Sequence, residues 1–65
     1  MKTGYVTFEM SIESGNEALM NDTIGEITSI LNDTAKKIYS GKFEGKLKDI
    51  NGNTVGMYSL AIFDE

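Results

Sequence analysis

The chain has 65 residues, which allows one small domain spanning residues 1–65. It contains no cysteine, histidine or arginine, and its net charge is −4. Without Cys and His it lacks a thiolate nucleophile, an imidazole base and the usual zinc ligands, so we expect neither an enzyme nor a cofactor. The negative charge and the missing arginines argue against binding to duplex DNA or RNA.

The longest apolar runs are a few residues, whereas a membrane span needs roughly 20. The first ten residues also lack the apolar region of a signal peptide. We therefore expect a soluble, cytoplasmic protein that does not bind membranes. A domain this small buries only about 60% of its unfolded surface, so self-association or docking on a partner is expected to stabilise it.

Residues 5–13 alternate apolar and polar side chains, which is typical of a half-buried strand. One face carries Val6, Phe8, Met10 and Ile12, and the other carries Tyr5, Thr7, Glu9, Ser11 and Glu13. Residues 14–16 interrupt this strand, and the following segment EALM is assigned no regular structure. Its Leu19 and Met20 are expected either at the edge of the core or on a contact surface.

From residue 22 the hydrophobic period changes from 2 to 3.6, which predicts one amphipathic helix. Its apolar stripe consists of Ile24, Ile27, Leu31, Ala35 and Ile38. Asp22 or Thr23 is expected as the N-cap, and Thr23 with Glu26 fits a capping box. Gly41 is expected to end the helix in the left-handed conformation.

The dipeptide Asn51-Gly52 predicts a hairpin with a two-residue type I′ turn. Counting outward from this turn pairs Lys48 with Val55 and Gly45 with Tyr58. This register places Phe43, Leu47, Tyr58, Leu60 and Ile62 on one face, and Lys42, Glu44, Lys46 and Lys48 on the other. The loop also resembles the start of a calcium-binding loop, but it lacks the glycine spacing and the terminal glutamate, so we expect no metal site.

The element order is β-α-β-β, and residues 54–63 are apolar on both faces, as expected of a central strand. We predict an α+β fold: a single two-layer domain with a three-stranded antiparallel sheet in the order 1-3-2 and one helix packed on one face. The predicted core consists of Val6, Phe8, Met10, Ile12, Ile24, Ile27, Leu31, Ala35, Ile38, Phe43, Leu47, Tyr58, Leu60 and Ile62.

The sheet face that points away from the helix is the predicted interface with a partner or a second copy. Its residues are Tyr5, Thr7, Glu9, Val55, Met57, Ala61 and Phe63. An apolar centre with a polar rim is typical of an interaction surface. Alternatively, the methylene stems of the neighbouring lysines cover this face in a monomer.

Catalytic residues are not indicated. The carboxylates of Glu9 and Glu13 share one strand face but lie roughly 13 Å apart, too far for a joint acid–base site. Serine and threonine hydroxyls have no imidazole to activate them. The glycines match no phosphate-binding motif.

The segments VTFEMSIES, EITSILNDTAKKI and GKLKDINGNTVG together resemble small uncharacterised proteins encoded by phages and prophages. This resemblance implies an accessory protein that acts in the host cytoplasm, such as an anti-CRISPR or another anti-defence inhibitor. The leading hypothesis is therefore a non-enzymatic binding protein that blocks a host defence or regulatory protein by occupying its surface.

Two alternatives remain open from the sequence. One is an oligomer that sequesters a small nucleotide-like signalling molecule; Tyr5, Tyr39, Asn51 and Asn53 would contact its base, and Lys42, Lys46 or Lys48 its phosphate. The other is a structural or assembly protein of the virion.

Overall fold

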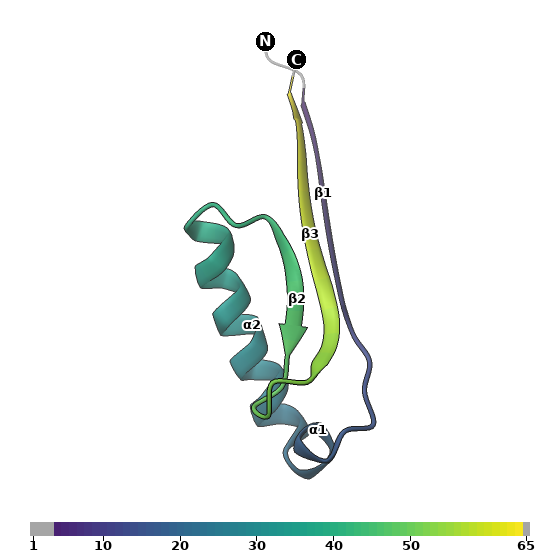
Figure 1. Ribbon diagram of the computed structural model, residues 1–65. Helices are drawn as coiled ribbons and strands as arrows, with labels where there is room; N and C mark the ends of the chain where they lie inside the picture. Colours follow the sequence, from purple (N-terminus) through teal and green to yellow (C-terminus); the bar gives the residue numbers. More distant parts are fainter. Residues whose placement is uncertain (1–3, 65) are drawn as a thin grey trace.

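The computed structural model describes residues 4–64, in which three strands form one sheet, a long helix packs beside it and a short helix lies at one end of the domain next to the long helix (Figure 1). The elements are β1 (Gly4–Ile12), α1 (Glu17–Asn21), α2 (Thr23–Tyr39), β2 (Glu44–Lys48) and β3 (Thr54–Asp64). β3 lies in the centre and is antiparallel to both neighbours, so the strand order is β1-β3-β2. The predicted α+β fold, with its antiparallel sheet and packed helix, is confirmed.

β1 and β3 extend well past the rest of the domain (Figure 1). Their pairing runs from Gly4 opposite Asp64 to Ile12 opposite Gly56, whereas β2 reaches only as far as Ser59 on β3. The molecule measures 49 × 19 × 17 Å, and its radius of gyration is 14.0 Å, against about 11 Å for a compact domain of this length. We call the extended part, residues 4–8 and 60–64, the β1–β3 ribbon.

The core lies at the opposite end of the sheet from the tip of the ribbon. Its buried apolar residues are Leu19, Ile30, Leu47, Val55 and Tyr58, with Met10, Ile12, Ile27 and Ile38 packed against them. Of the predicted core, Val6, Phe8, Ile24, Leu31, Ala35, Phe43 and Ile62 are instead exposed. Val6, Phe8 and Ile62 are exposed because they lie on the ribbon, beyond the reach of the helices.

α1 is a helix of five residues where the sequence predicted no regular structure. Leu19 is buried in the core, whereas Met20 next to it is 68% exposed. The hydroxyl of Thr23 donates to the backbone oxygen of Leu19 (2.7 Å), which ties the start of α2 to α1. The short helix therefore adds one apolar side chain to the core.

The face that α2 turns inward overlaps the predicted one only in part. Ile30 and Thr34 are buried, and Ile27 and Ile38 are half-buried, so the buried stripe is rotated away from Leu31. The buried Thr34 hydroxyl donates to the backbone oxygen of Ile30 (2.8 Å). Because this bond satisfies the polar group, a threonine can occupy a position that the hydrophobic pattern passes over.

The start of α2 confirms Asp22 as the N-cap, since its carboxylate accepts from the backbone N–H of Gly25 (3.2 Å). The predicted capping box between Thr23 and Glu26 is wrong. The Glu26 carboxylate instead accepts from the backbone N–H of Ile50 in the hairpin loop (3.1 Å). A residue expected to cap its own helix thus fastens the helix to a distant loop.

Hydrogen bonds fix the connection from α2 to β2, both where it leaves the helix and where it enters the strand. Gly41 has a φ of 102°, and the N–H of Lys42 donates to the backbone oxygen of Lys37 (2.9 Å), which is the bonding pattern of a Schellman motif. The hydroxyl of the buried Tyr58 then donates to the backbone oxygen of Lys42 (2.9 Å). The Tyr58 ring lies against Gly45, where a β-carbon would stand 3.1 Å from the ring.

The hairpin loop differs from the predicted type I′ turn. Within residues 4–64, only Gly41 and Gly52 have positive φ, so Asn51 does not adopt the conformation that this turn requires. The N–H of Asp49 donates to the oxygen of Asn53, and the N–H of Gly52 donates to the oxygen of Asp49. These bonds close a loop of three residues between Asp49 and Asn53, in which Gly52 takes the left-handed position.

The register of β2 and β3 is confirmed near Tyr58 and wrong near the loop. Gly45 pairs with Tyr58 as predicted, but Lys48 pairs with Thr54 and not with Val55. The register shift leaves Val55 as an extra residue and turns its side chain into the core, where it is 3% exposed. Val55 is therefore buried and offers almost no surface to a partner.

Candidate functional site

The other six predicted interface residues lie on the sheet face away from α2, which we call the outer face. The strand register brings them together: Tyr5 pairs with Phe63, Thr7 with Ala61, and Met57 lies further along β3. The rings of Tyr5 and Phe63 are 5.8 Å apart between centroids, at 34°. Tyr5, Met57 and Phe63 are 64%, 62% and 56% exposed.

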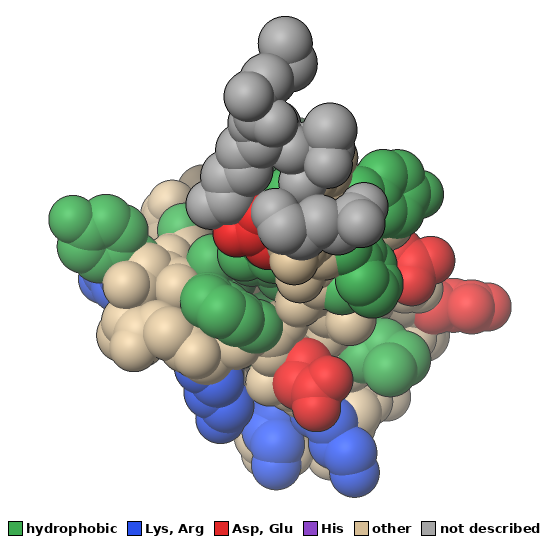
Figure 2. Space-filling model, turned by 90° about the horizontal axis from the view of Figure 1, so that it is seen from above, with side chains coloured by type: hydrophobic (Ala, Val, Ile, Leu, Met, Phe, Trp, Pro, Cys, Tyr) green, Lys and Arg blue, Asp and Glu red, His purple; other side chains and the backbone are tan. Residues whose placement is uncertain are grey.

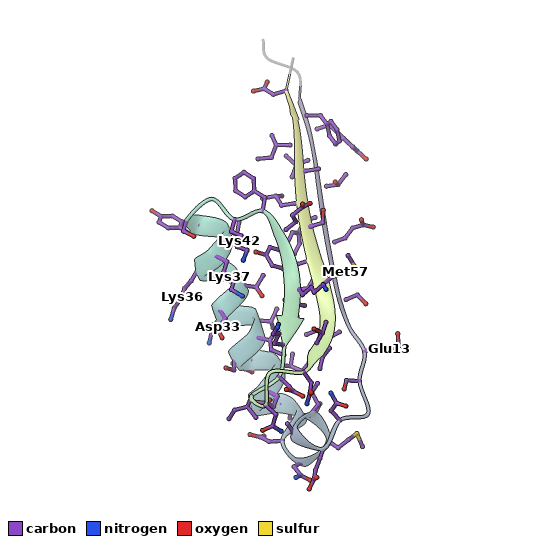
Figure 3. All side chains as sticks on the ribbon, in the orientation of Figure 1. Glu13, Asp33, Lys36, Lys37, Lys42 and Met57 are labelled. Atoms are coloured by element: carbon purple, nitrogen blue, oxygen red, sulfur yellow. The ribbon has the colours of Figure 1, made fainter. Side chains whose placement is uncertain are left out.

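Met57 stands at the middle of the outer face, and in Figure 3 it lies on the side of the sheet away from α2. It pairs with Ser11 on β1 and with Lys46 on β2. It also borders three shallow hollows of about 410 to 470 Å³. A flexible apolar side chain between hollows is suited to insertion into a partner surface.

The two sides of the outer face carry different charges. Glu9 and Glu13 follow the β1 side, and Lys46 and Lys48 lie on the β2 side together with Glu44. The rim is thus acidic along one edge and largely basic along the other. Such a rim orients an incoming partner and raises the rate of encounter more than the affinity.

Lys46 and Lys48 on the edge strand β2 also border a cleft of about 380 Å³ between α2 and β2, which we call the lysine cleft. Its charged lining residues are Asp33, Lys37, Lys42, Lys46, Lys48 and Asp49. Figure 2 shows lysine side chains gathered along one side of the molecule, and Figure 3 shows Lys37 and Lys42 on the helix side of the sheet. Four ammonium groups around one cleft favour an anionic ligand.

The residues proposed to bind a nucleotide are only partly brought together. Lys42, Lys46 and Lys48 line the lysine cleft, and Lys37 joins them from α2. Tyr5, in contrast, lies on the β1–β3 ribbon, and no aromatic side chain of residues 4–64 lines the cleft. The cleft therefore offers charge to a phosphate but no stacking surface to a base.

Asp49 holds the hairpin loop and does not present its oxygens to solvent. One oxygen accepts from the N–H groups of Asn51 and Asn53 (both 2.9 Å), and the other accepts from the side-chain amides of Asn53 and Asn16. Burial alone would raise the pKa of the Asp49 carboxyl, but these hydrogen bonds outweigh burial and hold the pKa below its ordinary value. The carboxylate that suggested a calcium loop therefore has a structural role.

Comparisons with known proteins do not extend this description. No family model matches the sequence, and neither the curated proteins nor the solved structures include a match. In the part of the chain that the structure describes, neither helix combines the length and hydropathy needed to cross a membrane. The outer face and the lysine cleft are therefore the features from which a function is inferred.

Proposed function

We propose that the chain is a non-enzymatic binding protein that acts by placing its outer face against the surface of another protein. The observation that carries this proposal is the exposure of Tyr5, Met57 and Phe63, each more than half accessible, on one face of the sheet. Large apolar side chains grouped within a charged rim are typical of protein interfaces. Following the resemblance to phage proteins, the proposed partner is a host defence or regulatory protein, which the bound domain inhibits.

Capture from a host lysate with three immobilised forms of the protein tests the proposal. Met57→Asp places a charge at the centre of the outer face, whereas Met20→Asp makes the same change at a similarly exposed methionine on α1. We expect the wild type and Met20→Asp to enrich the same protein, and Met57→Asp to lose it. Equal recovery by Met57→Asp, or no enriched protein with the wild type, would refute the proposal. Circular dichroism of each variant shows that it is folded.

The lysine cleft supports a second candidate, the sequestration of a small anionic signalling molecule. Thermal unfolding in the presence of cyclic nucleotides tests it, because a ligand at 100 times its Kd stabilises the fold by about 2.7 kcal/mol. Lys37→Gln with Lys42→Gln should abolish the rise in Tm, and Lys36→Gln, outside the cleft lining, should preserve it. A rise that survives the double substitution would place the ligand elsewhere.

A further inference from the structure

The two edges of the sheet differ in how they are protected. β2 is short, carries Lys46 and Lys48, and meets a register shift at its end; short strands, lysines and bulges all discourage further pairing. β1 is nine residues long and contains a single charged residue, Glu9. Within residues 4–64, no strand pairs with its outer edge. β1 therefore presents a regular, unprotected edge to another strand.

Two hydrogen bonds define which backbone groups point out of this edge. The N–H of Glu13 donates to the oxygen of Val55 on β3 (2.8 Å), and the N–H of Leu60 on β3 donates to Phe43 on the β2 side (2.7 Å). In an antiparallel ladder the direction alternates along the chain. The odd-numbered residues of β1 therefore bond to β3, and the N–H and C=O groups of its even-numbered residues point outward.

We propose that a second copy of this chain binds along this edge, with the two β1 strands antiparallel about a two-fold axis at Phe8. The two sheets then form one continuous sheet of six strands. Phe8 is the midpoint of Gly4–Ile12, so this register pairs the whole strand with itself. A two-fold interface has to be self-complementary, and a strand paired about its own centre meets this requirement.

The position of Glu9 favours the register with its axis at Phe8 over the registers with the axis one residue away on either side. With the axis at Phe8, Glu9 faces Thr7 of the second copy, and no charged residue lies opposite another. With the axis at Glu9, the two Glu9 carboxylates would lie directly opposite each other, which is unfavourable. With the axis at Thr7, Ser11 and Ile12 would lie opposite positions outside β1. The Phe8 register therefore combines complete pairing with separated charges.

The same pairing stabilises the β1–β3 ribbon and gives its exposed apolar side chains neighbours on the second copy. A ribbon of two strands is marginally stable in water, and Val6 and Phe8 on its helix side are 59% and 49% exposed. Pairing places Phe8 beside Phe8 of the second copy, and Val6 beside Met10, as cross-strand apolar neighbours. Because the axis is perpendicular to the sheet, both outer faces point the same way. The dimer thus presents two binding faces to a partner, which goes beyond the proposed function of one face.

Hydrogen exchange across a dilution series, together with mass measurement by light scattering, tests the proposal on the wild-type protein. We expect a dimer in which the amides of Val6, Phe8 and Met10 are protected at high concentration and lose protection on dilution. The amides of Thr7 and Glu9 bond to β3 and should be better protected than these three amides after dilution. A monomer at millimolar concentration, or a dimer in which the three even-numbered amides exchange rapidly, would overturn the proposal.

Charge substitutions test the register itself. Thr7→Glu places a glutamate opposite Glu9 at two symmetric positions and should weaken the dimer about 2- to 30-fold. Adding Glu9→Lys turns both contacts into opposite-charge pairs and should restore dimerisation, whereas Met57→Asp on the outer face should leave the dimer unchanged. Equal dimer Kd values for Thr7→Glu and the double variant would contradict the register. If Thr7→Glu does not fold, the hydrogen-exchange pattern of the wild type still tests whether β1 pairs with β1 of a second copy.

Discussion

Replacing Leu19 by alanine tests whether the short helix α1 belongs to the core. Leu19 is 5% exposed and lies in the same cluster as Ile30 and Val55, whereas Met20 beside it is 68% exposed. The two residues share one helix and are both large and unbranched at the β-carbon, so Met20→Ala is a matched control. Only burial distinguishes the two substitutions strongly.

The expected magnitudes follow from this difference in burial. Truncating a buried leucine to alanine costs about 2 to 5 kcal/mol. A domain of 65 residues has a free energy of unfolding of about 3 to 10 kcal/mol, so Leu19→Ala removes a large part of it. With a urea m-value of about 1 kcal/mol/M, the unfolding midpoint should fall by about 2 M or more. Met20→Ala should change the free energy by less than about 0.5 kcal/mol.

Urea unfolding followed by far-UV circular dichroism measures both variants. All samples need the same protein concentration, because self-association would shift the midpoint. Similar midpoints for Leu19→Ala and Met20→Ala would refute the reasoning, since they would show that the Leu19 side chain adds nothing to the core. A shift confined to Leu19→Ala would place α1 in the cooperative fold.

Three further predictions concern the loop, the central strand and the buried tyrosine. The folded-state pKa of Asp49 is lowered, so its stabilising contribution should be complete above the ordinary carboxyl pKa of 3.8. This contribution should be lost as the pH falls through the folded-state pKa. Asp49→Asn should flatten this part of the profile of urea midpoint against pH. Gly56→Ala should destabilise the sheet, because its β-carbon would collide with a backbone oxygen of β1, whereas Gly15→Ala has open space, and thermal unfolding compares them. Tyr58→Phe should lower the free energy of unfolding by about 1 kcal/mol in urea titrations, since it removes one buried hydrogen bond.

The candidate site was predictable where it depends on alternation alone. Residues at odd positions of β1 share one face, and the pairing of Gly45 with Tyr58 places Met57 on that face as well. Val55 was expected to be exposed on the outer face but is buried, because the Asp49 side chain holds a three-residue loop and the register shifts beside it. The lysine cleft was predicted only in part: Lys42, Lys46 and Lys48 were named as phosphate contacts, whereas Lys37 joins them only once the orientation of α2 is known.

The sequence by itself determined the strand order, the residues Asp22 and Gly41 that flank α2, and which residues share each face of β1. The strand faces and helix ends follow from local periodicity and capping, which involve residues close together in the chain, and the strand order follows from the apolar residues on both faces of residues 54–63. Only the tertiary structure decided how much of the sheet is covered. The 17 residues of α2 span about 25 Å, whereas the 11 residues of β3 span about 36 Å. The helix is therefore shorter than the strand beneath it, and alternating apolar residues that look like core at the far end of the sheet remain exposed on the β1–β3 ribbon.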